Sequence, residues 1–189
     1  REVRPQPALA WYLGLNWSPD GQSIAVTGVD VKGRLGIFRV DVHTGALSAI
    51  HVPVPLNYQG PFWSPDGANL GFFAQGKLKK IAIAGGPPQT LCDAANGRGG
   101  TWNRDGVILF APQAGPIFRI PASGGERTQV TQLDEQRRSH RFPQFLPDGR
   151  HFLYYVTGSV ASTDVRGLYV GQLNGTDTHR LTDADVGGV

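Results

Sequence analysis

A six-residue element that occurs four times constrains this sequence more than any other feature. It reads Asn-Trp-Ser-Pro-Asp-Gly at residues 16–21 and Phe-Trp-Ser-Pro-Asp-Gly at residues 62–67. Two altered copies follow, Thr-Trp-Asn-Arg-Asp-Gly at 101–106 and Gln-Phe-Leu-Pro-Asp-Gly at 144–149. The copies lie about 40 residues apart, a period typical of proteins built from one small β-sheet per repeat. The element therefore predicts an array of four similar sheets.

Each repeat contains four short strand-like segments separated by Gly, Pro, Asn and Asp, the residues that favour turns. In the first repeat we expect strands at 11–18, 23–27, 34–41 and 47–52. The corresponding second to fourth strands of the later repeats are expected at 69–74, 78–83 and 89–92, at 107–111, 116–120 and 127–131, and at 151–156, 167–173 and 178–182. No repeat shows a helical period.

The second strand of each repeat is apolar on both faces, as in Ile24-Ala25-Val26 and the segment 107–110. A sheet with one face in water would alternate apolar and polar residues. Sheets buried on both faces must be sandwiched between neighbours, and radial stacking of such sheets is a β-propeller. A β-sandwich would not need the same turn at a fixed period. The predicted fold is therefore all-β, a β-propeller with four blades of four antiparallel strands.

The domain boundaries follow from the repeats. Residues 1–10 are expected to be a lead-in or linker, and 184–189 the start of a further blade. The four blades are expected at about 11–52, 57–92, 98–132 and 139–183. The chain contains no methionine and begins at Arg1, so we expect a piece of a longer protein. Its open ends could be covered by further sequence, by association of two copies into a homo-oligomer, or by closure of four blades on themselves.

Composition narrows the function classes. With 40% hydrophobic and 17% charged residues the chain is typical of a soluble globular protein. No apolar run approaches the ~20 residues of a membrane-spanning helix. The net charge of +3 is not concentrated as in nucleic-acid binders, so no nucleic-acid partner is expected. Cys92 is the one cysteine, which excludes an internal disulfide and favours a buried structural thiol.

Catalytic motifs are missing from the sequence. It has no Gly-x-Ser-x-Gly elbow, no His-Glu-x-x-His motif and no phosphate-binding loop, because the glycine-rich run 97–100 lacks a strand-then-helix context. The five histidines are scattered without ligand spacing. We therefore expect no catalytic residue, no metal and no cofactor in this chain.

The repeated residues themselves are expected to be structural. Each Asp should bond its own turn backbone, and each Gly should supply a positive φ. Trp17, Trp63 and Trp102 could form a carbohydrate platform, but their identical place in each repeat favours wedges between blades. This signature comprises Trp17, Asp20, Gly21, Trp63, Asp66, Gly67, Trp102, Asp105, Gly106, Phe145, Asp148 and Gly149.

A candidate partner-binding rim lies among the longer links at 29–33, 53–59, 93–98, 134–141 and 159–166, since binding residues tend to lie on loops held by a rigid scaffold. Its basic members are Arg98, Arg137, Arg138, His140 and Arg141. One interpretation is a solvated charged rim. The other is a site for an acidic peptide or another anion, bound by bidentate arginine hydrogen bonds.

The Trp-Ser-Pro-Asp-Gly turn, the strand Ile24-Ala25-Val26 and the Gly-Gly turns resemble the repeats of TolB-type propellers over residues 11–183. The Trp-Asp dipeptide of WD repeats, the Gly-Gly placement of kelch repeats and the spaced Asp and Gly of sialidase Asp-boxes do not match. Repeat three departs from the pattern at Arg104, and repeat four at Phe145-Leu146.

This resemblance implies three alternatives for function. The segment from Gly76 to Pro112 resembles propellers that follow the kinase domain of some bacterial receptor-type Ser/Thr kinases, which implies a periplasmic or extracellular sensor or scaffold module that binds a protein or peptide. The repeats are also similar to the gating propeller of prolyl-oligopeptidase-type serine peptidases, whose catalytic domain would be separate. The third alternative is a truncated or engineered fragment that closes by oligomerisation.

Overall fold

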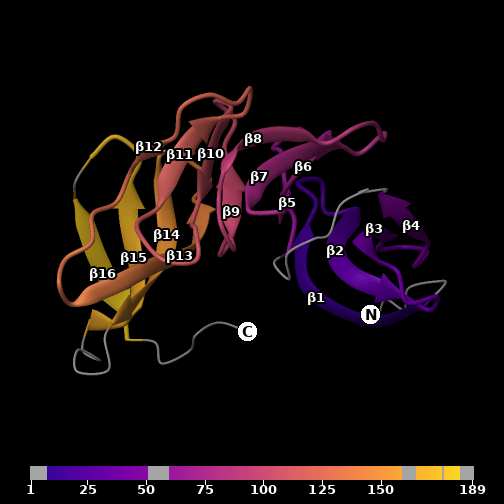
Figure 1. Ribbon diagram of the computed structural model, residues 1–189, viewed down its shortest axis with the longest axis horizontal. Coiled ribbons are helices and arrows are strands. Elements are labelled where there is room, and N and C mark those ends of the chain that lie inside the picture. The colour runs from indigo at the N-terminus through magenta and orange to yellow at the C-terminus, as the bar shows by residue number, and fades with distance from the viewer. Residues whose placement is uncertain (1–7, 51–59, 159–164, 176, 184–189) are drawn as a thin grey trace. The chain divides into compact units, whose positions relative to one another are not determined.

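The computed structural model describes residues 8–50, 60–158, 165–175 and 177–183. Within these residues the chain forms four sheets, each of four antiparallel strands in chain order (Figure 1). The predicted fold class, an all-β propeller with four-stranded antiparallel blades, is confirmed.

The strands of the four sheets have the following bounds. The first sheet contains β1 (Leu9–Trp17), β2 (Ser23–Asp30), β3 (Leu35–Asp41) and β4 (Leu47–Ile50). The second contains β5 (Phe62–Trp63), β6 (Asn69–Ala74), β7 (Lys77–Ala82) and β8 (Gln89–Asp93). The third contains β9 (Gly100–Trp102), β10 (Val107–Phe110), β11 (Phe118–Pro121) and β12 (Thr128–Gln129). The fourth contains β13 (Arg137–Phe145), β14 (His151–Gly158), β15 (Gly167–Gln172) and β16 (Thr178–Thr182).

Two expected boundaries are wrong at the ends of strands. Strand β1 begins at Leu9, inside the expected lead-in 1–10, because β2 continues to Asp30 and offers it a pairing partner. Strand β13 begins at Arg137 and not at 139, and takes residues from the expected link 134–141. The expected start of a further blade at 184–189 lies outside the described residues, as do the link 53–59 and most of the link 159–166.

The chain divides into two compact units, residues 1–96 and 97–189, each containing two of the sheets. In each unit the core fills the space between its two sheets. The core of the first unit contains Ala25, Ile37, Ile50, Trp63, Leu70, Phe72, Ala74 and Ile81. The core of the second contains Leu109, Ala111, Ile117, Phe145, Phe152, Tyr154, Val156 and Tyr169. Both sets come from two sheets, which explains why the second strands of the repeats carry so few polar residues. Cys92, by contrast, is half-buried in β8, not buried as expected.

The Asp-Gly turns of Asp20, Asp66 and Asp148 are built as expected, with each carboxylate accepting backbone amides of its own turn, whereas the turn of Asp105 is not. The carboxylate of Asp20 accepts hydrogen bonds from the Ser18 hydroxyl, at 2.6 Å, and from the Gln22 amide, at 3.0 Å. These two bonds lower the pKa of Asp20 below its usual value. The glycine that follows, Gly21, has a φ of 69°, a conformation that side chains disfavour. In the third repeat Asn103 accepts the turn amides of Asp105 and Val107 in place of an aspartate.

The aromatic residue of the repeated element lies at different depths in different sheets. Trp63 is 8% exposed and packs among residues of the first sheet, and Phe145 is buried in the same way against the third. Trp17 occupies the same place in the first repeat but is 53% exposed. The expected wedge role therefore describes Trp63. Trp102 is half-buried, and Trp17 is not packed between two sheets of this chain.

Candidate binding site on strand β13

Strand β13 is irregular at two points, and each irregularity changes which way its side chains lie. Its register against β14 shifts between Arg137 and Ser139 and again between Arg141 and Gln144. In a regular strand two residues three positions apart lie on opposite faces. Here Arg137 and His140 both lie on the Tyr154 side of the sheet, because the first shift intervenes. Such bulges are frequent next to functional sites, where they redirect side chains.

The second irregularity holds a residue in an uncommon conformation. Phe142 has a φ of 53°, in the left-handed region, where bulky side chains are rare. Its amide donates a 2.8 Å hydrogen bond to the carbonyl of Arg98, which ties β13 to the chain just before β9. Gly99 makes this approach possible, since a Cβ at that position would lie 3.0 Å from the Phe142 Cα atom. Strained residues of this kind gather at functional sites more often than elsewhere.

This contact brings two arginines together. The positive charge of Arg98 is close enough to lower the pKa of Arg141, together with the partial burial of Arg141 itself, which is the larger cause. The Nε atom of Arg98 is buried and has no hydrogen-bond partner among the described residues. The Nε–H of Arg141 donates only a long 3.3 Å bond to the Ser139 hydroxyl. The backbone contact therefore joins the segments that carry two arginines, and the Nε donors of both are weakly used or unused.

A pocket of about 190 Å³ lies beside β13, in the second unit. It is bounded by the chain after β12 and by strands β14, β15 and β16. Its lining contains Val130, Thr131, Gln132, Arg137, Phe152, Tyr154, Gly171, Gln172, Gly175 and Thr178. Most of its polar atoms belong to hydroxyl, amide and guanidinium groups, so the pocket is rich in hydrogen-bond donors.

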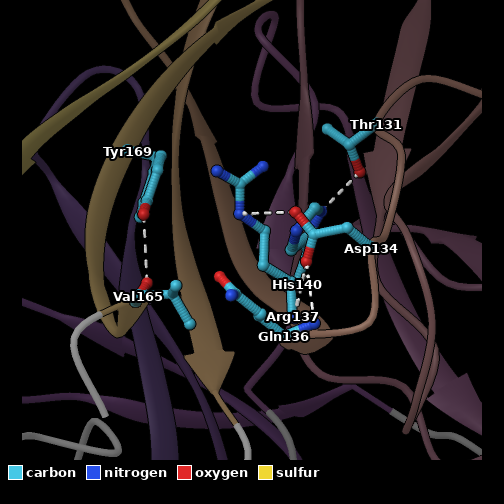
Figure 2. A network of polar contacts seen from close by, with 7 residues as sticks. All are labelled: Thr131, Asp134, Gln136, Arg137, His140, Val165 and Tyr169. Atoms are coloured by element: carbon cyan, nitrogen blue, oxygen red, sulfur yellow. Dashed lines mark hydrogen bonds and ion pairs between the residues drawn. The ribbon is translucent and has the colours of Figure 1, made fainter. Parts of the chain in front are cut away.

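Arg137 is held at this pocket from two sides. Its Nε atom lies 3.5 Å from a carboxylate oxygen of Asp134, and its guanidinium carbon lies 5.4 Å from the centre of the Tyr169 ring. Figure 2 shows the guanidinium group between these two residues, with its terminal nitrogens directed away from Asp134. The Tyr169 hydroxyl in turn donates a 3.0 Å hydrogen bond to the carbonyl of Val165. The position of the cation is therefore fixed by an ion pair and an aromatic ring.

His140 lies beneath this arrangement and is only 1% exposed. Its Nδ1 atom lies 2.7 Å from the Thr131 hydroxyl, which also accepts the amide hydrogen of Ile117 (Figure 2). Burial, reinforced by the charge of Arg137, lowers the pKa of His140 to about 4. The ring is therefore neutral at physiological pH, and its Nε2 atom has no hydrogen-bond partner among the described residues.

The expected basic rim is thus divided between two places. Arg98 and Arg141 lie together, Arg137 lies at the pocket, and His140 is buried, so its inclusion in a solvent-exposed rim was wrong. Arg137, Arg138, His140 and Arg141 belong to strand β13 and not to a loop. The reason is that the β14 strand is long enough to pair with all of this segment, up to Gly158.

Several residues at these sites were not expected from the sequence, namely Thr131, Asp134, Phe142, Tyr154 and Tyr169. One signal was available. When the repeats are aligned on Asp20 and Asp148, Arg137 and Arg141 correspond to Leu9 and Leu13 of β1, which shows a register shift at the same first point. The same backbone thus carries apolar residues in one repeat and charged ones in another, so the fold does not require the charges.

Two other features are absent from the described residues, a metal-binding cluster and a membrane-spanning helix. No group of three or more histidine, cysteine, aspartate or glutamate side chains among them could hold a metal ion. No helix in the same part of the chain is long and apolar enough to cross a membrane.

Comparison with known proteins gives relatives at low identity. No family model matches the chain. It is 24% identical over 149 residues to the uncharacterized peptidase YuxL of Bacillus subtilis, a match that covers 78% of this chain and 22% of YuxL.

Solved structures match over most of the chain. TolB from Acinetobacter baumannii has a TM-score of 0.75 at 17% identity, covering 93% of this chain and 44% of that one. Puromycin hydrolase has a TM-score of 0.68 at 15% identity, covering 95% of this chain and 30% of that one. The chain thus spans less than half of each of these proteins. In fold, the chain is a β-propeller of the TolB type.

Proposed function

We propose that this chain is a non-catalytic propeller module of a larger bacterial protein and that it binds an acidic peptide segment of a partner at Arg98 and Arg141. The observation that carries the proposal is geometric: the Phe142 amide, next to Arg141, bonds the carbonyl of Arg98, and the buried Nε atom of Arg98 has no hydrogen-bond partner among the described residues. A carboxylate between the two arginines would use the idle donors.

The position of the pair in the fold supports this function. Arg98 lies just before β9 and Arg141 lies in β13, two strands that pack against each other in the second unit. A low-dielectric wall of packed strands strengthens the field of a charged pair more than a water-exposed rim would. The bulge at Phe142 is a costly feature, and it holds Arg141 near Arg98.

We assign the parent protein to the sensors or scaffolds outside the cytoplasm, on the resemblance to propellers that follow receptor-type kinase domains. The similarity to TolB, at 17% identity, supports the fold and carries no argument about localisation. A fractionation of cells that express the parent protein with a C-terminal tag tests it. Recovery in the periplasm or the medium supports the assignment, and recovery in the cytosol contradicts it.

The binding role is tested with a synthetic peptide of three consecutive glutamates, capped at both ends, and a matched glutamine peptide. We expect the glutamate peptide to bind in titration calorimetry and the double variant Arg98→Gln, Arg141→Gln to weaken it at least tenfold. The matched control is Arg150→Gln, which removes an exposed arginine from the turn before β14 and should leave the affinity unchanged. Equal binding by the double variant would remove the proposal.

A second candidate function is the propeller of a serine peptidase of the prolyl-oligopeptidase type. The similarity to YuxL and to puromycin hydrolase favours it. In that case a separate hydrolase domain would carry the nucleophile, and the propeller would control access to it. The sequence of the parent protein decides between the two: a Gly-x-Ser-x-Gly motif after this segment supports the peptidase, and a kinase domain with a membrane helix before it supports the sensor.

The exposed face of β1 gives the chain a further partner, a second copy of itself. Five large apolar side chains of this strand are exposed: Trp11, Tyr12, Leu13, Leu15 and Trp17. Soluble monomers seldom leave so many large apolar side chains of one strand in water, and the Trp63 position of the second repeat is covered by a neighbouring sheet. Light scattering of the isolated chain should give the mass of a dimer, which Trp17→Ser should reduce. A clean monomer at high concentration would contradict association.

A further inference from the structure

We infer that the pocket at Arg137 is a second binding site, which takes a single carboxylate group through the terminal nitrogens of that arginine. This inference goes beyond the proposed function, since it concerns a different arginine and a different place in the second unit. It stands on the shape of the pocket, on the way Arg137 is held and on the chemistry of the lining.

The size of the pocket limits what it can hold. Its volume of about 190 Å³ is below the roughly 300–1,000 Å³ of sites for drug-sized ligands and cofactors. It is large enough for one acidic side chain or one small organic acid. The floor is partly aromatic, with Phe152 and Tyr154, which suits the methylene groups of such a ligand. Gly171 lets these rings pack closely against β15, because a Cβ there would lie 2.9 Å from the Phe152 ring.

Arg137 is prepared to bind a planar anion. A guanidinium group has five N–H donors, and the Nε edge here faces Asp134. The two terminal nitrogens have no hydrogen bond to another described residue, and together they match the two oxygens of a carboxylate. Because the ion pair and the Tyr169 ring already restrict the side chain, little rotamer entropy is lost when a ligand binds.

The carboxylate of Asp134 does not block the binding of an anion in the pocket. One of its carboxylate oxygens accepts the backbone amides of Gln136, at 3.0 Å, and Arg137, at 2.8 Å, so the group is fixed in its own turn. Asp134 is exposed and does not line the pocket. No aspartate or glutamate is among the lining residues. The pocket therefore offers hydrogen-bond donors and one cation to an anionic ligand.

The fold gives no structural reason for an arginine at this position. The corresponding residue of the first repeat is Leu9, which packs against the apolar cluster Val26, Phe38 and Val40. A leucine is thus compatible with the same strand start. The cation is accommodated here by the ion pair with Asp134 and by the ring of Tyr169. As a result, a positively charged group lines the pocket.

The test uses nuclear magnetic resonance titration of the whole chain with three probes: glutarate, a capped Gly-Glu-Gly peptide and a capped Gly-Gln-Gly peptide. We expect saturable shifts of the Arg137, Tyr154 and Thr178 signals with the two acids, and at least tenfold weaker binding of the glutamine peptide. Arg137→Lys keeps the positive charge but loses the planar guanidinium group with its paired N–H donors, and should weaken binding by about tenfold. Arg150→Gln, which changes an exposed arginine outside both sites, should leave the saturable shifts of Arg137, Tyr154 and Thr178 as in the wild type.

Each outcome has one reading. Tighter binding of the glutamate peptide than of glutarate identifies a peptide side chain as the ligand, and the reverse identifies a free acid; both support a carboxylate site. Equal binding of the glutamate and glutamine peptides to the wild type, or no saturable shift near Arg137, overturns the inference without any variant having to fold. Loss of the saturable shifts near Arg137 in the double variant Arg98→Gln, Arg141→Gln alone would assign the carboxylate to the Arg98–Arg141 pair and also overturn it.

Discussion

The indole N–H of Trp63 donates a 3.0 Å hydrogen bond to the carbonyl of Asn16, which joins the repeated element of one blade to that of the next. The donor and the acceptor come from successive copies of the same six-residue stretch. The bond satisfies a polar atom that would otherwise be buried without a partner, because Trp63 is packed in the core between the two sheets. The repeated element therefore forms the contact between blades as well as the turn within each blade.

Trp63→Ala should destabilise the protein by about 3–5 kcal/mol, since it removes a buried aromatic side chain and leaves a cavity between two sheets. Trp17→Ala is the matched control at a protein concentration where the chain is a monomer, because it changes the same position of the repeat where the side chain is exposed, and it should then cost less than about 1 kcal/mol. Urea denaturation followed by fluorescence measures both. Equal losses for the two variants would contradict the wedge role of Trp63.

Asn103 connects two blades of the second unit. Its side-chain N–H donates a 2.9 Å hydrogen bond to the carbonyl of Gly149, while its oxygen accepts two amides of its own turn. Asn103→Ser introduces the residue of the first two repeats, which can hold the turn but cannot reach Gly149. We expect a loss of about 1 kcal/mol in the free energy of unfolding. An unchanged value would mean that the connection between the blades contributes nothing.

Gly99 is required by the close approach of Phe142. Gly99→Ala places a Cβ 3.0 Å from the Phe142 backbone, in addition to the strain of a φ of 95°. Gly125→Ala is the control: its φ of 125° is also positive, but no atom lies within 4 Å of the new Cβ. We expect Gly99→Ala to cost roughly 1 kcal/mol or more beyond the control and to weaken binding of the acidic peptide. Equal stability and binding in the two variants would contradict a role for this contact.

The buried His140 should make stability depend on pH. Burial lowers the pKa of His140 from 6.5 to about 4 in the folded chain. Between these two pH values the unfolded chain therefore binds more protons than the folded chain does. Stability should therefore be complete above about pH 6.5 and fall by up to about 3 kcal/mol as the pH drops towards 4. In His140→Gln the dependence over this window should be smaller by that amount. A variant with the same dependence as the wild type would show that His140 does not titrate in this way.

Much of the fold could be predicted from the repeated element, because turn residues and apolar segments report directly on local structure. The strands β6 and β16 have the bounds expected from the sequence. The start of β13 was predicted wrongly, since its pairing depends on the length of the distant strand β14 and not on its own residues.

The candidate sites were harder to predict from the sequence. The sequence identified the basic residues Arg98, Arg137, Arg138, His140 and Arg141. Its periodicity does not show that a bulge turns Arg137 and His140 to the same face of the sheet. The contact of Asp134 and Tyr169 with Arg137 could not be foreseen either, because it joins three elements through tertiary packing. One local feature of the sequence did point to strand β13: Arg137 and Arg141 of the fourth repeat stand where the first repeat has Leu9 and Leu13.

The central claim, binding of an acidic peptide by Arg98 and Arg141, is tested most directly by following the side-chain Nε–H signals of these arginines during titration with the triglutamate peptide. The account predicts that both signals shift together and saturate at one affinity, which falls as salt is added. Shifts spread evenly over all arginines of the chain, or no shift at these two, would contradict it.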